Sequence, residues 1–164
     1  MVLRLNWLSS FCLASSFLLS VASIGLAKDA VSLKFKKQKI ELMQKKNKKI
    51  ITVEIAEAPE QHAQGLMFRK KLKNNEGMLF IFNEELVREF WMKNTLINLD
   101  IGYFDKNKKL IDIQQMKAVT SIMQTDLPTY PSKQPAMYAL EMQQAWFKKN
   151  KFTEGTEFKI ISGP

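Results

Sequence analysis

The sequence predicts one α+β domain that is mainly β, a compact, barrel-like arrangement of about seven to nine short strands with two short helices. Apolar and polar residues alternate along several segments, as they do in half-buried strands. Two segments rich in lysine and asparagine separate such strands, as hairpin turns do. No stretch rich in Pro, Gly or Ser divides the chain after its first 30 residues, and a length of 164 residues suits a single domain.

The first predicted element is a hairpin. Its strands are indicated by apolar residues at every second position, Val31, Leu33 and Phe35 before the turn and Ile51, Val53 and Ile55 after it. Lys45–Lys49 is the predicted turn, because asparagine tolerates the left-handed backbone of tight turns. The same chemistry at Asp105–Lys109 predicts a second hairpin, with strands at Ile101–Phe104 and Leu110–Ile113.

The middle of the chain is predicted to contain a short helix followed by two strands. Pro59 suits the first turn of a helix, where its missing N–H is not needed, and Glu60 favours the positive end of the helix dipole. Gly77–Phe82 has the continuous apolar character of a buried strand. Phe90–Met92 is predicted to be another strand.

The C-terminal part is predicted to contain a loop, a strand, a helix and a closing strand, at Thr129–Ser132, Tyr138–Met142, Gln143–Asn150 and Glu157–Ile160. The core is expected to include the residues of the most apolar segments, because such segments cannot face water on both sides. These residues are Met78, Phe80, Phe82, Trp91, Leu99, Ile101 and Leu140.

The first 27 residues have the composition of a secretion signal. Arg4 is the only charged residue among them, Trp7–Ala27 is mostly apolar, and Gly25-Leu26-Ala27 supplies small residues at a cleavage site. We expect cleavage after Ala27 and a periplasmic or secreted protein. The alternative is a retained anchor, since roughly 20 apolar residues can span a bilayer. The one cysteine, Cys12, lies in this segment, so the mature chain would fold without disulfides.

Positive charge is concentrated in an N-terminal arm. Residues 28–51 contain nine lysines and two acidic residues, whereas residues 52–164 contain 15 basic and 14 acidic residues. We therefore divide the chain into a signal peptide (1–27), a basic arm with the first strands (28–50) and one β-rich domain (51–164). The arm could contact an anionic surface, or its lysines could keep a hairpin edge soluble. We expect no nucleic-acid binding, because the domain lacks a basic stripe.

Several kinds of chemistry are excluded by the residues that the chain lacks. The mature chain has no thiol, no Gly-x-Ser-x-Gly elbow and no glycine-rich phosphate loop, and His62 is its single histidine. We therefore expect no cofactor, no metal site and no assignable catalytic residue. Methionines could be soft copper ligands, but they lie within apolar strings, which favours packing.

Three strings of residues carry a resemblance to a known family. They are Gly65-Leu66-Met67-Phe68-Arg69, Glu76-Gly77-Met78-Leu79-Phe80 and Phe90-Trp91-Met92-Lys93-Asn94-Thr95, with Leu99-Asp100 shortly after. Their order and spacing resemble the domain of unknown function 192 family of small bacterial and archaeal proteins, over about Ile51 to Ile160. The resemblance implies a compact β-rich fold and no established activity.

Seven residues are candidates for ligand binding: Arg69, Trp91, Lys93, Asn94, Thr95, Asp100 and Glu141. Asp100 and Glu141 lie inside apolar runs, and a buried carboxylate must be paired or hydrogen-bonded. Arg69 or Lys93 is therefore expected within salt-bridge distance of one of them. The alternatives are structural: Trp91 packs in the core, Arg69 closes a helix, turn chemistry explains Asn94 and Thr95, and strand alternation turns the carboxylates to solvent.

Three functions remain open from the sequence. The first is an exported binding module, a monomer with one polar cleft for a small ligand or a cell-envelope component. The second is a carboxylate-based hydrolase that uses Asp100 and Glu141. The third is an interaction protein that docks through its basic N-terminal arm. We expect the binding module rather than an enzyme.

Overall fold

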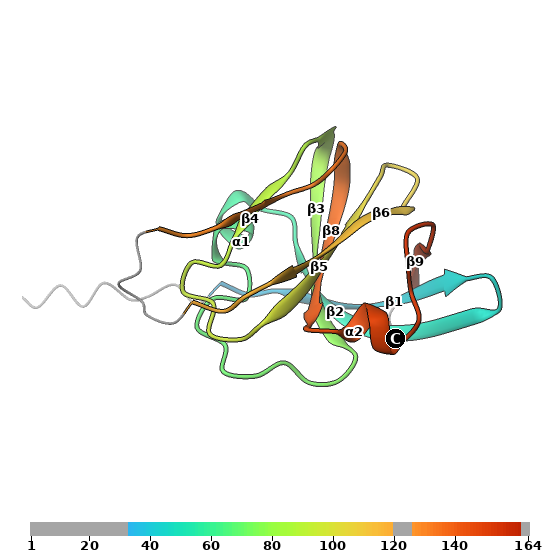
Figure 1. Ribbon diagram of the computed structural model, residues 1–164, viewed down its shortest axis with the longest axis horizontal. Coiled ribbons are helices and arrows are strands. Elements are labelled where there is room, and N and C mark those ends of the chain that lie inside the picture. Colours follow the sequence, from blue (N-terminus) through green and yellow to red (C-terminus); the bar gives the residue numbers. More distant parts are fainter. Residues whose placement is uncertain (1–32, 120–125, 162–164) are drawn as a thin grey trace, which may run out of the picture. The chain divides into compact units, whose positions relative to one another are not determined.

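The computed structural model describes residues 33–119 and 126–161, and within these ranges it contains nine strands and two helices (Figure 1). The strands are β1 (Lys36–Gln44), β2 (Asn47–Ala56), β3 (Glu76–Leu86), β4 (Glu89–Trp91), β5 (Leu99–Phe104), β6 (Leu110–Met116), β7 (Thr129–Pro131), β8 (Ala136–Gln143) and β9 (Glu157–Ile161). The helices are α1 (Pro59–Gln64) and α2 (Trp146–Lys149). The predicted signal peptide lies outside the described residues. Within the described ranges, no helix is long and apolar enough to cross a membrane.

Seven of these strands form one sheet in the order β6-β5-β8-β3-β2-β1-β9, and β4 pairs with β7 in a second, two-stranded sheet. Only β2 and β3 are parallel neighbours in the described sheets. A parallel pair requires a crossover connection, and the segment 57–75, which contains α1, supplies it. The prediction of a mainly β, α+β domain with two short helices is confirmed.

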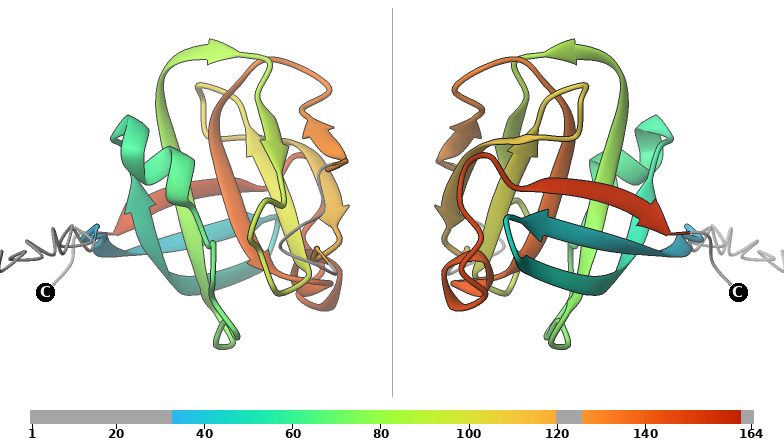
Figure 2. Two further views of the ribbon diagram at one scale, coloured as in Figure 1. Left: turned by 90° about the vertical axis from the view of Figure 1, so that its left-hand side faces the viewer. Right: turned by 90° about the vertical axis from the view of Figure 1, so that its right-hand side faces the viewer.

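The large sheet coils on itself without closing. Figure 2 shows β1 and β9 running across the direction of β3 and β8. The two ends of the sheet approach each other at one isolated bridge, between Lys109 and Glu157. The N–H of Leu110 also donates to the carbonyl oxygen of Thr156 at 2.7 Å. The barrel-like prediction therefore describes the curvature, but the sheet is not a closed barrel.

Both lysine-rich segments lie at hairpin turns, as predicted. The left-handed residues are lysines, Lys45 with φ 54° and Lys108 with φ 62°, so the assignment of that role to asparagine is wrong. Asn47 belongs to β2, where its side-chain amide donates to the carbonyl oxygen of Asn150 at 2.8 Å. In the second turn the Asp105 carboxylate accepts the N–H of Lys109 at 2.9 Å, which stabilises the turn from its first residue.

Three assignments differ from the sequence analysis. The first strand begins at Lys36, so residues 33–35 are not part of it, and Val31 lies outside the described residues. Thr129–Ser132 was predicted to be a loop, but its first three residues form β7. Pairing with β4 explains this strand, and Pro131 is tolerated because β7 is an edge strand. The predicted domain boundary between residues 50 and 51 lies within β2.

The sheet buries apolar side chains on both faces. One cluster includes Val53, Leu79, Leu140 and Met142, and the other includes Met78, Phe80, Leu99, Ile101 and Tyr103. Five of the seven predicted core residues are fully buried. Phe82 is half-buried, and Trp91 is 50% exposed, so these two predictions are wrong. Trp91 is exposed because β4 belongs to the small sheet and not to the large one.

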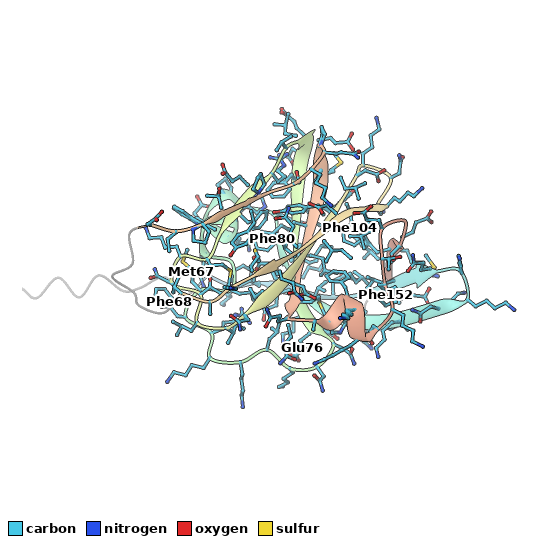
Figure 3. The ribbon with its side chains drawn as sticks, viewed as in Figure 1. Met67, Phe68, Glu76, Phe80, Phe104 and Phe152 are labelled. Carbon is cyan, nitrogen blue, oxygen red and sulfur yellow. The ribbon has the colours of Figure 1, made fainter. Side chains whose placement is uncertain are left out.

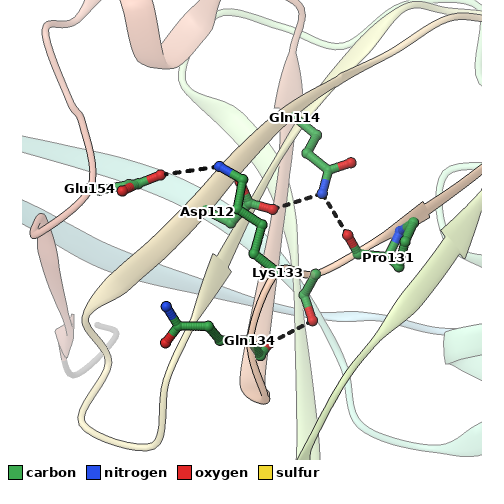
Figure 4. A network of polar contacts seen from close by, with 7 residues as sticks. Asp112, Gln114, Pro131, Lys133, Gln134 and Glu154 are labelled. Carbon is green, nitrogen blue, oxygen red and sulfur yellow. Dashed lines mark hydrogen bonds and ion pairs between the residues drawn. The ribbon is translucent and has the colours of Figure 1, made fainter.

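A polar network attaches β7 to β6 (Figure 4). Gln114 donates to the fully buried Asp112 carboxylate at 2.7 Å and to the carbonyl oxygen of Pro131 at 2.6 Å. Lys133 Nζ lies 2.9 Å from Asp112 Oδ1 and 3.4 Å from the Glu154 carboxylate. The pKa of Lys133 is raised above its ordinary value, chiefly by the Asp112 carboxylate. This network holds the two-stranded sheet beside the main one.

Candidate functional site

A cleft of about 250 Å³ lies between α1 and residues 87–91, which include β4. Residues 62–67 and 87–91 line it from either side, and side chains of β3, β8 and the loop after β4 complete it. Met67 and Phe80, both labelled in Figure 3, come from the loop after α1 and from β3. The cleft therefore contains parts of all three strings that carry the family resemblance.

The Gly65-Leu66-Met67 string builds one wall of the cleft. Gly65 ends α1 with φ 47° and ψ −134°, and its N–H donates to the carbonyl oxygen of Gln61 at 2.9 Å. The chain can turn there because glycine has no Cβ. Leu66 then enters the core, and the N–H of Phe68 donates to the carbonyl oxygen of Asn94 at 2.8 Å. This hydrogen bond joins the loop after α1 to the loop after β4, so residues 65–68 and 94–95 are held together.

Replacing Gly65 with Ala is expected to destabilise the protein by about 1–3 kcal/mol, because an L-residue is strained at this backbone conformation. A Cβ would lie 3.4 Å from the Phe80 ring, an ordinary contact, so strain and not a clash causes the loss. Urea unfolding measures the effect, with Gln64→Ala at the preceding position as the control. A Gly65→Ala variant as stable as the control would contradict this account of the turn.

Glu141 is the buried charged group of the cleft. It is 5% exposed, and its Oε2 has no hydrogen-bond partner among the described residues. Burial raises the pKa of Glu141 to about 8, and the positive charge of Arg69 offsets only part of this effect. The carboxyl group is therefore largely protonated at neutral pH and can either donate a hydrogen bond or ionise beside a suitable ligand.

The strand register explains how Glu141 comes near Arg69. Glu54 of β2 is aligned with Met78 of β3, and Met78 is aligned with Glu141 of β8, so all three side chains share one face of the sheet. Neighbouring strands are about 4.8 Å apart, which separates the two glutamates by roughly 10 Å at the backbone. Arg69 forms a bidentate ion pair with Glu54, at 3.0 Å and 2.5 Å.

The predicted salt bridge of Arg69 or Lys93 with Asp100 or Glu141 is wrong. Arg69 pairs with Glu54, whose carboxylate offers the two-oxygen geometry that a guanidinium prefers. Lys93 Nζ lies 5.2 Å from the ring centroid of Trp91, at the surface.

Asp100 lies on the opposite face of the sheet from Glu141. In the β5–β8 register Asp100 is aligned with Met142 and Ile101 with Glu141, and successive residues of a strand point to opposite faces. The Asp100 carboxylate accepts the N–H of Ala145 at 2.9 Å and lies near the N–H groups of Trp146 and Phe147 at the start of α2. Burial nevertheless raises the pKa of Asp100 above its ordinary value. These contacts hold the start of α2.

The remaining candidates divide between the cleft and the turn beside it. Trp91 and Thr95 line the cleft together with Glu141. Thr95 is buried, and its hydroxyl donates to the carbonyl oxygen of Lys93 at 3.2 Å. Asn94 takes a left-handed conformation with φ 53°, which supports the turn interpretation for this residue. The structure therefore brings Trp91, Thr95 and Glu141 together at the cleft and places the Asp100 side chain on the other face of the sheet.

Aromatic side chains make up much of the cleft, and of these only Trp91 was predicted as a site residue. Phe80 and Phe90 meet edge to face with their ring centroids 4.9 Å apart, and the rings of His62 and Phe82 are 4.7 Å apart. Nε2 of His62 lies 3.0 Å and 3.1 Å from the carbonyl oxygens of Ala56 and Ile81. Because carbonyl oxygens only accept hydrogen bonds, Nε2 carries a hydrogen and donates it to them. The phenylalanines at every second position of β3 were the sequence signal for this wall, but they were attributed to the core.

Arg88 and Glu89 are the other charged residues of the cleft that sequence reasoning missed. The Arg88 guanidinium lies 4.0 Å from the centroid of the Phe82 ring. Its Nε donates to the carbonyl oxygen of Ala136 at 3.2 Å, and another of its nitrogens donates to the carbonyl oxygen of Glu84. Within residues 33–119 and 126–161, no three His, Cys, Asp or Glu side chains are grouped as metal ligands would be.

Comparisons with known proteins agree with this fold. The DUF192 family, described as an uncharacterized ACR, matches residues 40–160. A putative transcription regulator from Sinorhizobium meliloti 1021 is 28% identical, with a TM-score of 0.69 over 78% of this chain and 96% of that one. A protein of unknown function from Novosphingobium aromaticivorans DSM 12444 is 26% identical, with a TM-score of 0.69 over 79% of this chain and 89% of that one. No curated protein matches the chain.

Proposed function

The chain belongs to the DUF192 family, and we propose that this family member is a binding protein whose cleft between α1 and β4 holds a small ligand. The observation that carries the proposal is Glu141, which lines the cleft, is almost fully buried and has no hydrogen-bond partner for Oε2 among the residues that the structure describes. A buried polar atom without a hydrogen bond costs free energy, and a ligand group that bonds to it removes that cost. Aromatic walls with a few polar groups are the usual composition of small-molecule sites.

The alternative of a hydrolase that uses Asp100 and Glu141 together has no geometric support. The two carboxylates point to opposite faces of the same sheet, so they cannot flank one scissile bond. Regulation of transcription, which the description of the Sinorhizobium protein suggests for that protein, is not what we propose for this chain. The chain has a formal net charge of +9, but its lysines are concentrated in residues 28–51, and none of those residues lines the cleft.

Export to the periplasm or the medium is part of the proposal and rests on the composition of residues 1–27. The mature protein isolated from its native cell is expected to begin at Lys28, because the small residues of Gly25-Leu26-Ala27 form the cleavage site. N-terminal sequencing of the protein checks this. Recovery of a chain that begins at Met1, still attached to membranes, would support the retained-anchor alternative.

The binding proposal is tested by amide chemical shifts in the presence of small molecules of several classes. The panel contains amines, carboxylic acids, amides and alcohols, each at about 10 mM, a concentration at which millimolar ligands are detected. At least one class is expected to shift the amide resonances of Gly65, Thr95 and Glu141, which line the cleft. A panel in which no class perturbs the cleft would overturn the proposal.

A further inference from the structure

Resting on the proposed binding function, we propose that the cleft takes a small organic cation, a short primary amine in its ammonium form. Its charged end pairs with the Glu141 carboxylate and its apolar part lies against the aromatic wall formed by Phe82, Phe90 and Trp91. Three observations support this ligand class: the charges that are free in the cleft, the chemistry of its walls and its size.

The charged groups of the cleft that are not already engaged are acidic. Glu141 and Glu89 line the cleft, and Oε2 of Glu141 has no partner among the described residues. Arg88 is held over the Phe82 ring and by two carbonyl oxygens. Nε2 of His62 is likewise engaged by two carbonyl oxygens. A ligand that enters this cleft therefore meets two carboxyl groups, and no described residue forms a hydrogen bond with the buried Oε2 of Glu141.

The charged and titratable groups packed around Glu141 do not supply its missing partner. Arg69 is the cation whose charge lowers the pKa of Glu141, but it is already in a bidentate ion pair with Glu54 on the same face of the sheet. Tyr103 of β5 donates its hydroxyl to the carbonyl oxygen of Tyr130. Burial and the nearby Glu141 carboxylate raise the pKa of Tyr103 well above its ordinary value, so it stays neutral. Among the described residues, no side chain forms a hydrogen bond with Oε2 of Glu141, which leaves this carboxyl group for a ligand.

An ammonium group satisfies this site better than an anion does. It provides three N–H donors for the Glu141 carboxyl group, and a charge-assisted hydrogen bond is stronger than a neutral one. The faces of aromatic rings attract cations, and Trp gives the largest effect. The volume of about 250 Å³ corresponds to roughly eight water molecules at about 30 Å³ each, so the ligand is short.

Binding of the cation also changes the protonation of Glu141. The carboxyl group is mostly protonated at pH 6.5 in the free protein, since burial raises its pKa to about 8. An ammonium group held beside it favours the ionised form, so one proton leaves Glu141 for the buffer as the ion pair forms. Release of nearly one proton per ligand is expected at about pH 6.5, and almost none at about pH 9, where Glu141 is already ionised and the amine is still an ammonium.

The experiment uses n-butylammonium, with butyrate and n-butanol as anionic and neutral probes of the same length. Amide shifts give the dissociation constants at constant ionic strength, and calorimetry in two buffers of different ionisation enthalpy gives the protons released. We expect n-butylammonium to bind with a millimolar dissociation constant, as the small number of its atoms allows, and to bind at least tenfold more tightly than butyrate.

The Glu141→Gln variant is expected to bind n-butylammonium at least tenfold more weakly and to release no proton. Glu76→Gln, at a surface glutamate outside the cleft, is the matched control and should bind as the wild type does. Tighter binding of butyrate or butanol than of n-butylammonium would overturn the ligand class while leaving the binding function intact. Unchanged binding in Glu141→Gln would also overturn it. If none of the three probes perturbs the cleft up to about 100 mM, the ligand class fails, and the wider panel of small molecules decides the binding function separately.

Discussion

Replacing Glu141 with Gln is expected to stabilise the protein relative to the wild type, by an amount that grows with pH to roughly 4–5 kcal/mol above pH 8. The pKa of Glu141 rises from 4.5 to about 8 on folding, so the folded state holds a proton that the unfolded state has lost between these values. Wild-type stability therefore falls as the pH rises through this window. Glutamine has the shape of the protonated side chain and no charge to desolvate.

Urea unfolding of both proteins at about pH 4 and about pH 8.5 measures this difference in unfolding free energy, because contributions from other titrating groups cancel between wild type and variant. At the lower pH the two proteins should be nearly equally stable. At the higher pH the variant should be the more stable one. A difference that does not change with pH would mean that Glu141 ionises normally in the folded protein.

Replacing Asp100 with Ala is expected to have the opposite effect, a loss of roughly 2–4 kcal/mol. Asp100 is 2% exposed and its carboxylate accepts the N–H of Ala145, beside the N–H groups of Trp146 and Phe147. Alanine leaves these buried donors without an acceptor at the start of α2. Binding of n-butylammonium should be unchanged, because Asp100 lies on the other face of the sheet.

Asp100→Asn is the control for this prediction, because its side-chain oxygen can still accept the N–H of Ala145. Since burial raises the pKa of Asp100, removal of the charge should cost little, and the Asn variant should be close to the wild type in unfolding free energy. Equal stability of Asp100→Ala and the wild type would contradict the structural role assigned to this carboxylate.

The strands were predictable because their evidence is local. Ile51, Val53 and Ile55 alternate with polar residues, and the structure buries all three in β2. Pro59 likewise begins α1, where a missing N–H has no consequence. Such features depend on residues within a few positions of one another, and a single sequence contains all of them.

The site was only partly predictable because its contacts depend on strand register. In the sequence, Glu54 is simply one of the polar residues of an alternating strand. It becomes the partner of Arg69 because β2 and β3 pair in parallel, which aligns Glu54 with Met78 and, through it, with Glu141. Whether Asp100 and Glu141 share a face likewise depends on a one-residue choice of register between β5 and β8. No local pattern determines either pairing.

The exposure of Trp91 was unpredictable for a related reason. The apolar string around Trp91 predicts a buried strand. In the structure, however, β4 pairs with β7, about forty residues later in the chain, and not with a strand of the main sheet. The side chain is left half-exposed at the mouth of the cleft. The pairing of β4 with β7 also places Arg88 and Glu89 at the cleft.

The most direct measurement of the central claim is a pH titration of the Glu141 carboxyl carbon by NMR, with and without n-butylammonium. The claim is that this buried carboxyl group, whose Oε2 has no partner in residues 33–119 and 126–161, ionises when a cation enters the cleft. We expect a midpoint near the pKa of about 8 in the free protein, and a clearly lower midpoint with the amine present. A midpoint close to 4.5 that n-butylammonium does not change would contradict the account.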